Sequence, residues 1–203
     1  IIKYDKYSDS TNFEDLVNCE IIFISVPTPF DCNNKIVDDS AIIENLERLE
    51  SLNYSKIVLI KSTVLPGSCK EYANNFKLNI VFNPEFLRES TTPNEDFKNQ
   101  DKIVIGTDSN KLFLRVKEMY KKVTIPQAEF YHTSTTEAEM IKCAQNTMLA
   151  SRVALANMIF DACQEMNIDY NKLKEIAFDN FEVIGPHMVQ VPGPDGKRGF
   201  GGK

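Results

Sequence analysis

The feature that most constrains this chain is an alternation of short apolar runs with helix-like stretches. Runs rich in Ile, Val and Phe lie at 1–4, 20–26, 56–61, 79–82 and 102–105. Between most of them are helix-like stretches at 38–52, 68–75 and 110–122. Short β-branched runs that alternate with amphipathic segments are typical of alternating strands and helices. The sequence therefore predicts an α/β domain built on a doubly wound parallel sheet.

A different pattern begins at Ser134. Glu139 follows two threonines in a helix-start pattern, and no Gly or Pro interrupts the sequence from there to Met166, which predicts one long helix. Its apolar positions cover more than one narrow stripe, so we expect it to pack on two sides, against the sheet domain and against another helix or subunit. A buried core helix is the simpler alternative. A shorter helix is predicted at 170–178.

Composition excludes several classes of protein. The 203 residues, 42% of them hydrophobic, can form one substantial core, or one domain and the start of another. The net charge of −6 argues against a nucleic-acid partner. Apolar runs are far shorter than the roughly 20 residues of a membrane helix, so we expect no membrane association and a soluble, cytoplasmic protein. The five cysteines are widely spread without a C-x-x-C pair, so we expect reduced thiols and no metal site.

Polar residues follow each predicted strand, at the sheet edge where doubly wound folds bind their ligands. Asp5, with Lys6 beside it, suits the ribose hydroxyls of NAD, although a solvated turn would look the same. Thr28 lies between two prolines that end the next strand, and Thr63 follows the strand after that. These threonines are candidate cofactor contacts or ordinary loop residues. The chain has no G-x-G-x-x-G loop.

Two further groups carry possible catalytic chemistry. Glu85 and Glu89 are four residues apart with Arg88 between them, and two carboxylates in one cleft could divide base and hydrogen-bonding roles. Acidic residues in the first turn of a helix would give the same pattern. Lys142 and Asn146 are also four apart, on one face of the long helix, where they could stabilise an oxyanion. A helical lysine is more often a solvated surface residue.

The last twelve residues, 192–203, are rich in glycine and contain Lys197, Arg198 and Lys203. This composition lets the backbone approach a ligand closely and supplies cations for phosphate or sugar hydroxyls. A disordered terminus is the alternative. The chain begins without methionine in a strand-like run and stops within a glycine-rich loop, so we expect both ends to be cut from a longer protein.

Five segments resemble, in this order, those of the UDP-glucose/GDP-mannose dehydrogenase family over essentially the whole chain. They read VPTP, KST followed by PG, NPEFLRE, TEAE continuing as K-x-x-x-N, and GPDGKRGFGG. The resemblance implies NAD as cofactor and a nucleotide sugar as substrate, oxidised twice at C6 through a thiohemiacetal on a cysteine. It also implies an incomplete Rossmann-like NAD-binding domain at 1–132, then the linking helix and the start of an all-α central domain at 133–203, with a homodimer formed through the long helix.

The resemblance also implies roles for individual residues. NAD contacts fall on Asp5, Lys6, Thr28 and Thr63, and Thr63 belongs to the catalytic set as well. Glu89 lies between the cofactor and the reacting carbon, and Glu85 or Glu89 orders the water that hydrolyses the thioester. Lys142 and Asn146 stabilise the oxyanion. The sugar site is lined by Glu85, Phe86, Leu87, Arg88, Glu89, Lys142, Asn146 and Gly201.

The nucleophilic cysteine of the family follows the glycine-rich loop directly, and the chain ends one step before it. None of Cys19, Cys32, Cys69, Cys143 and Cys163 lies in that context, so none is nominated, and we expect the fragment alone to be inactive. Within the family, UDP-glucose is the first choice of substrate, and GDP-mannose or another UDP-sugar stays open. Phe86 favours glucose or mannose over N-acetylmannosamine. A non-catalytic nucleotide-binding or dimerisation module is the alternative from another class.

Overall fold

The computed structural model describes residues 1–7, 12–87, 93–182, 191–193 and 196–198. Contacts between residues divide the chain into two compact units, Ile1–Cys143 and Ala144–Lys203. The first unit contains the sheet, and the second contains most of the long helix.

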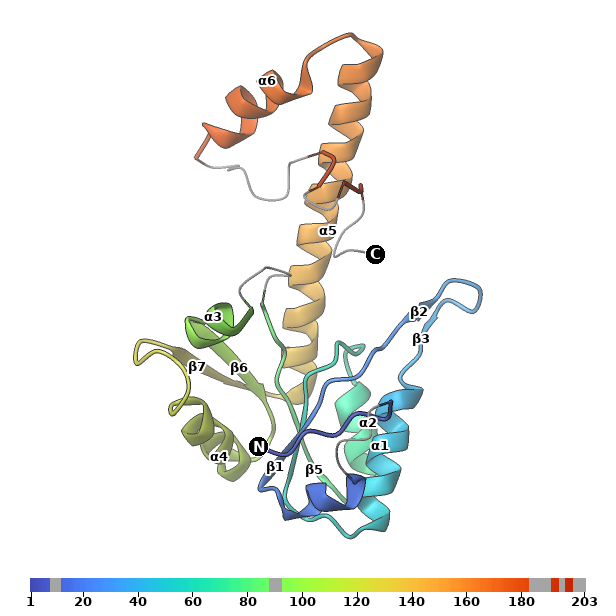
Figure 1. Cartoon of the computed structure of the whole chain (residues 1–203), viewed down its shortest axis with the longest axis vertical. Coiled ribbons are helices and arrows are strands. Elements are labelled where there is room, and N and C mark those ends of the chain that lie inside the picture. Colours follow the sequence, from blue (N-terminus) through green and yellow to red (C-terminus); the bar gives the residue numbers. More distant parts are fainter. Residues whose placement is uncertain (8–11, 88–92, 183–190, 194–195, 199–203) are drawn as a thin grey trace. The chain divides into compact units, whose positions relative to one another are not determined.

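The first unit is built on a five-stranded sheet with the strand order β1-β4-β5-β6-β7 (Figure 1). Strands β1 (Ile21–Ile24), β4 (Ile57–Ile60) and β5 (Asn79–Phe82) run parallel. Strands β6 (Lys102–Gly106) and β7 (Glu129–Thr133) are parallel to each other, and β6 meets β5 in an antiparallel bridge between Phe82 and Gly106. The predicted α/β fold is confirmed, with a sheet that is mixed.

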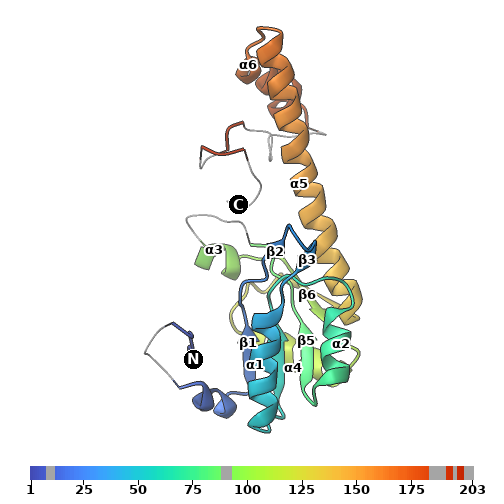
Figure 2. The same cartoon turned by 90° about the vertical axis from the view of Figure 1, so that its right-hand side faces the viewer.

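Helices cover both faces of this sheet (Figures 1 and 2). Helices α1 (Ser40–Ser51) and α2 (Ser68–Asn75) bury Leu46 and Tyr72 in one core cluster. Helix α4 (Asn110–Tyr120) contributes to a second cluster. Strand β4 is buried along its whole length, and its alternate residues enter opposite clusters, Val58 the first and Leu59 the second. This two-sided burial explains why the strand reads as an unbroken apolar run.

Several short elements complete the first unit. They are the 3₁₀ helix η1 (Phe13–Asn18), the antiparallel hairpin β2 (Phe30–Asp31) and β3 (Ile36–Val37), and helix α3 (Pro93–Lys98).

The strand predicted at 1–4 is not formed. Ile1 and Ile2 are exposed, whereas the Tyr4 ring lies edge-on to Phe13 at 5.1 Å and its hydroxyl accepts a hydrogen bond from Arg48 at 3.0 Å. Tyr4 therefore contributes to side-chain packing, and the run forms no backbone ladder.

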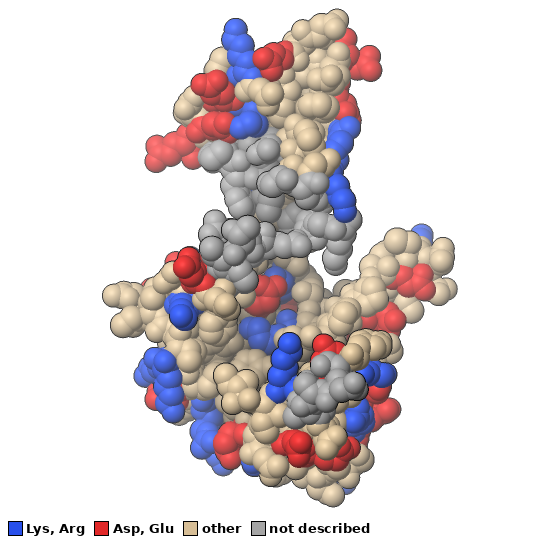
Figure 3. All heavy atoms as spheres, viewed as in Figure 1, with Lys and Arg blue, Asp and Glu red and all other residues tan. Residues whose placement is uncertain are grey.

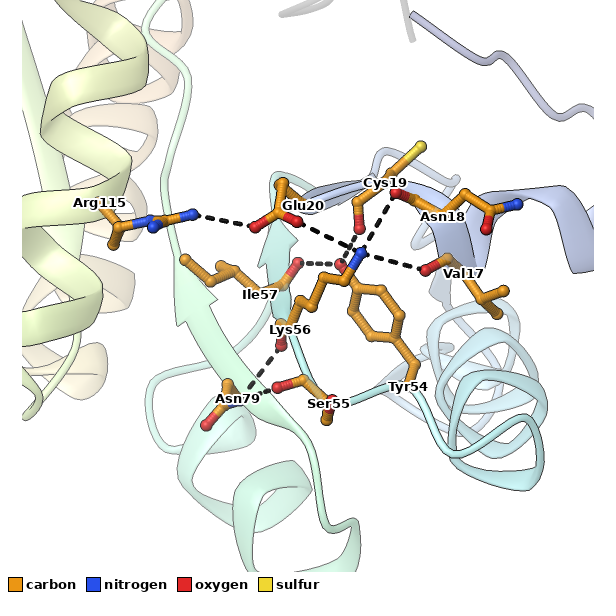
Figure 4. Close-up of polar contacts among 10 residues, drawn as sticks. All are labelled: Val17, Asn18, Cys19, Glu20, Tyr54, Ser55, Lys56, Ile57, Asn79 and Arg115. Carbon is orange, nitrogen blue, oxygen red and sulfur yellow. Dashed lines mark hydrogen bonds and ion pairs between the residues drawn. The ribbon is translucent and has the colours of Figure 1, made fainter.

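A polar network lies at the amino ends of β1 and β4 (Figure 4). Lys56 Nζ donates to the carbonyl oxygen of Asn18 at 3.2 Å and lies 3.4 Å from the carboxylate of Glu20, which also pairs with Arg115 at 2.9 Å. The buried Tyr54 hydroxyl lies within 3.2 Å of the carbonyl oxygen of Cys19. Partners within the chain satisfy these groups, so this edge of the sheet has a structural role.

Helix α5 (Thr135–Glu165) is the predicted long helix, and it continues from the first unit into the second. In the second unit it packs with α6 (Tyr170–Lys174), which is followed by the π-helical turn η2 (Glu175–Asp179). The Phe160 and Tyr170 rings meet edge-on at 5.2 Å beside the buried Cys163. In the described part of the chain, no helix has both the length and the hydropathy needed to cross a membrane.

Candidate functional site

Hydrogen bonds join the loops that follow β1 and β4. The Ser62 hydroxyl accepts a hydrogen bond from the Val26 amide at 2.8 Å and donates to the Val26 carbonyl at 2.7 Å. The Thr28 hydroxyl donates to the carbonyl oxygen of Thr63 at 2.7 Å. Neighbouring parallel strands bring their exits to one edge, and these bonds keep the two exits together. The structure thus brings together Thr28 and Thr63, the two threonines predicted to contact NAD.

Asp5 and Lys6 lie in a turn before η1. The Asp5 carboxylate accepts the main-chain N–H of Tyr7 at 3.0 Å. Lys6 is paired with Glu44 of α1 at 2.8 Å, and both side chains are exposed. The hydrogen bond to Glu44 raises the pKa of Lys6. Asp5 therefore presents a carboxylate to solvent, whereas the Lys6 ammonium has a partner within the chain.

Lys142 and Glu85 form a partly buried ion pair in the sheet unit. The Lys142 ammonium donates to the Glu85 main-chain carbonyl at 2.5 Å and to its carboxylate at 3.1 Å. The Lys142 side chain is 9% exposed and that of Glu85 37%. A buried ammonium is tolerated only with such partners. Lys142 is thus a buried residue held against the NPEF turn, and the surface-lysine alternative does not apply to it.

The neighbours of Glu85 complete this turn. Leu87 donates its main-chain N–H to the second carboxylate oxygen of Glu85 at 2.8 Å. The Lys142 ammonium lies 5.6 Å from the centre of the Phe86 ring, within range of a cation–π interaction. Glu85, Phe86 and Leu87 were all predicted to face the sugar. Glu85 and Phe86 lie around the Lys142 ammonium, and Leu87 holds the Glu85 carboxylate through its main-chain N–H.

Four predicted site residues remain. Asn146 lies four residues beyond Lys142 on α5, in the second compact unit, and is half-buried. Arg88, Glu89 and Gly201 lie outside the described residues. Their proposed roles stay predictions.

Sequence reasoning missed a partly buried lysine, Lys61, directly after β4. Its ammonium donates to the Asn83 side-chain oxygen at 2.8 Å and lies 3.3 Å from the Tyr120 hydroxyl. Asn83 in turn donates to the carbonyl oxygen of Val104 at 2.7 Å. Burial among these neutral partners lowers the pKa of Lys61 to about 8, against an opposing effect of the Glu85 carboxylate. A lysine directly after a wholly apolar strand was the available signal.

Sequence reasoning also missed Glu139, whose side chain is fully buried. One carboxylate oxygen accepts the main-chain N–H of Gly67 at 2.6 Å, and the other accepts that of Cys69 at 2.7 Å. These N–H groups belong to the start of α2, where a helix has donors without internal acceptors. The TEAE string was the signal, although it could equally have marked only a helix start.

Two of the five cysteines, Cys69 and Cys143, lie in surroundings that disfavour the thiolate. All five are free. Burial, and then the Glu139 carboxylate, raises the pKa of Cys69 and of Cys143. A thiol with a raised pKa is a weak nucleophile, in keeping with the absence of a nominated cysteine. In the described ranges, no three His, Cys, Asp or Glu side chains gather as a metal site would require.

Charges of both signs are interspersed over the face of the sheet unit that Figure 3 shows. The loops that follow β1 and β4 present the two joined threonines, and Asp5 presents an exposed carboxylate from the turn before η1. The edge where neighbouring parallel strands end is the usual position of a dinucleotide, and a carboxylate suits its ribose hydroxyls. The polar groups of these described residues are therefore compatible with NAD binding.

Two family models match the chain. The NAD binding domain of the UDP-glucose/GDP-mannose dehydrogenase family matches residues 2–124, and the central domain of that family matches 136–203. The chain belongs to this family. The expected cofactor, NAD, is confirmed by the same match.

Curated relatives agree with this assignment. The UDP-glucose 6-dehydrogenase of Rickettsia bellii is 34% identical over 196 residues, which cover 93% of this chain and 43% of that protein. UDP-glucose 6-dehydrogenase AglM of Haloferax volcanii is 30% identical and covers 87% of the chain and 45% of that protein. The chain therefore spans less than half the length of these relatives.

Solved structures share the fold. A UDP-glucose dehydrogenase from Pyrobaculum islandicum superposes with a TM-score of 0.73 at 27% identity, over 88% of this chain and 43% of that one. A GDP-mannose dehydrogenase from Pseudomonas aeruginosa, at 24% identity, gives a TM-score of 0.68 over 81% of this chain and 40% of that one. The second likeness bears on the fold alone.

Proposed function

We propose that the protein containing this chain oxidises UDP-glucose to UDP-glucuronate, with NAD as the oxidant. In this proposal residues 1–132 form the NAD-binding domain, and residues 133–203 form the linking helix and the start of the central domain. The single observation that carries the proposal is the buried Lys142 ammonium on the Glu85 turn. Relatives named UDP-glucose 6-dehydrogenase at 30–34% identity support the choice of substrate.

The chain would contribute charge stabilisation and positioning. Each oxidation removes two electrons from C6, and NAD, when bound, accepts them as a hydride. The Lys142 ammonium would donate a hydrogen bond to the C6 oxygen as negative charge develops there, with the Asn146 amide beside it. Such a donor is effective because it is already held in place, here by Glu85.

The carboxylates would act in the second oxidation. Glu85 or Glu89 would order the water that converts the cysteine-bound acyl group to a carboxylate. Phe86 and Leu87 would line the sugar, and Arg88 and Gly201 would lie nearby. Asp5, Thr28, Thr63 and Glu89 would face the cofactor. Lys6 would contribute only after it leaves Glu44.

Product stoichiometry tests this function. The intact protein, incubated with UDP-glucose and excess NAD, should release two NADH per sugar nucleotide consumed. Two NADH from GDP-mannose and none from UDP-glucose would move the substrate assignment within the family. NAD binding without turnover of any nucleotide sugar would instead support the non-catalytic binding module.

We also propose a homodimer through α5. In the second unit Met148, Leu155 and Met158 are 67%, 57% and 67% exposed. Their spacing of seven and three residues places them on one helix face. An exposed apolar row at this spacing is typical of a helix that packs against a partner helix. A second copy of this chain is the partner we propose, in a cytoplasmic enzyme that supplies UDP-glucuronate for polysaccharide synthesis.

A further inference from the structure

The first two turns of α5 contact the sheet unit at three places. Ala138 is fully buried against the end of β6, where a Cβ added to Gly106 would lie 2.7 Å from the Ala138 Cβ. Glu139 reaches the start of α2, and Lys142 reaches the turn after β5. All three contacts lie within Ile1–Cys143.

Of these three contacts, the Glu139 contact depends most on its hydrogen-bond partners, because it buries a carboxylate completely. Each carboxylate oxygen accepts one main-chain N–H, from Gly67 at 2.6 Å and from Cys69 at 2.7 Å. A carboxylate at a helix N-terminus is stabilised by the helix dipole and by charge-assisted hydrogen bonds. A fully buried carboxylate is strongly unfavourable without such partners. The position of Glu139 therefore fixes the start of α2, and the start of α2 fixes Glu139.

The segment just before α2 contains Thr63. Its carbonyl accepts the Thr28 hydroxyl, and the following residue, Val64, is buried and accepts a hydrogen bond from the Cys143 thiol at 3.6 Å. Gly67 ends the segment with φ at 103°, a conformation that favours glycine. The loop from Ser62 to Gly67 is thus held between the exit of β1 and helix α5.

Glu139 and Lys142 are three residues apart, so they lie on one face of α5. Glu139 holds the loop after β4, and Lys142 holds the turn after β5. One helix face therefore sets the distance between the Thr63 loop and the Lys142 ammonium.

We infer that Glu139 is a positioning residue, whose buried carboxylate keeps the NAD-facing Thr63 loop in register with the Lys142 ammonium. This inference rests on the proposed function for the roles of Thr63 and Lys142. It assigns Glu139 no contact with substrate or cofactor.

Glu139→Gln in the intact protein tests the inference. The amide has nearly the shape of the carboxylate, but its NH₂ group would face one of the two N–H donors, and the negative charge is lost. We expect kcat to fall at least about tenfold, with KM for UDP-glucose within about threefold of wild type. The dissociation constant for NAD should rise by about tenfold. The amides of Gly67 and Cys69 should exchange hydrogen faster.

Glu137→Gln is the matched control. Glu137 lies two residues earlier on α5, is exposed, and accepts hydrogen bonds from the Ser134 amide and hydroxyl at 2.8 Å. The control should leave kcat and NAD affinity unchanged. All rates are measured well below the melting temperature of each variant, so that unfolding cannot imitate the effect.

A lowered melting temperature with unchanged kcat and unchanged NAD affinity would overturn the inference and make Glu139 purely structural. If wild type turns over no nucleotide sugar, the proposed function fails, and NAD affinity with hydrogen exchange still decides the role of Glu139. Should Glu139→Gln not fold, Glu139→Asp keeps the charge but shortens the reach. Wild-type kcat and NAD affinity in Glu139→Asp would also count against the inference.

Discussion

At the scale of single residues, the sheet unit contains a buried lysine, Lys142, and a partly buried one, Lys61, in different settings. Lys142 has a carboxylate and a carbonyl as partners. Lys61 donates to the side-chain oxygen of Asn83 and lies beside the hydroxyl of Tyr120. The two lysines should therefore respond differently to substitution.

Lys142→Ala should lower kcat of the intact protein by about a hundredfold or more, because removing one preformed oxyanion donor has effects of that order. NAD affinity should stay within about threefold, since Lys142 contacts the Glu85 turn and not the threonine loops. Steady-state kinetics and NAD titration check both values. Lys70→Ala, at an exposed position of α2, is the control. Equal losses of kcat and NAD affinity would make Lys142 a structural residue.

Lys61 gives a pH-dependent prediction. Its pKa is about 8 in the folded protein, whereas an ordinary lysine, as in the unfolded chain, has a pKa of 10.5. Between these values the unfolded chain binds more protons, so the contribution of Lys61 to stability grows as pH rises and is lost as pH falls through 8. From pH 8 to pH 10, the free energy of unfolding of wild type should gain roughly 2 kcal/mol relative to Lys61→Met.

Urea denaturation of both proteins at several pH values measures this difference, and titrating groups that do not interact with Lys61 cancel in the comparison. Lys70→Met serves as the control, because that exposed lysine should show no such trend. A constant difference between wild type and Lys61→Met across pH 8 to 10 would contradict the low pKa of Lys61.

At the scale of elements, the start of α5 depends on the absence of a side chain at Gly106. A Cβ there would meet the Ala138 Cβ at 2.7 Å and the Ser134 carbonyl oxygen at 3.0 Å. Both neighbours belong to the start of the helix, so neither is the flexible end of a side chain. Close approach of α5 to the end of β6 requires glycine at this position.

Gly106→Ala should lower the free energy of unfolding by about 1–3 kcal/mol, the usual cost of overpacking a core. Chemical denaturation measures the change. The double variant Gly106→Ala/Ala138→Gly removes one side of the clash, so its loss should be smaller than the sum of the two single losses. Simple additivity would show that the helix start shifts without cost.

Elements with strong local patterns were predictable from sequence. Helix α2 and strand β5 have the predicted limits, 68–75 and 79–82, because apolar periodicity and flanking Gly or Pro define them locally. Strand β7 was missed because Glu129–Thr133 contains no Val or Ile and is only partly buried. The run at 1–4 was misassigned because apolar residues alone do not determine whether a segment joins a sheet.

The candidate site was predictable where a motif contains its own chemistry. Family motifs assigned both Glu85 and Lys142 to the sugar site, although the two residues are 57 positions apart. Lys61 and Glu139 were missed because their roles depend on burial and on partners from distant elements, Tyr120 and the start of α2. Such environments come from tertiary packing, so the local sequence signals at these two positions did not reveal them.

At the scale of the whole molecule, the exposed row on α5 predicts the oligomeric state. Leu155→Glu places a charge in the middle of the proposed apolar contact, and it should convert the dimer to a monomer because an unpaired charge is costly in such an interface. Light scattering during size-exclusion chromatography measures the mass. Gln164→Glu adds the same charge at another exposed position of α5 and should remain dimeric. A Leu155→Glu protein with the wild-type mass would place the interface elsewhere.

The main-chain carbonyl of Glu85 is an acceptor that no substitution at position 85 can delete. Lys142 donates to this oxygen at 2.5 Å, closer than to the carboxylate. In a saturation library, position 85 should therefore tolerate several residues with part of the activity retained. Position 142 should tolerate almost none, because arginine delivers its charge through a longer, planar group. If position 85 accepts more substitutions than position 142, the library would show that the main-chain carbonyl of residue 85 holds Lys142 in part.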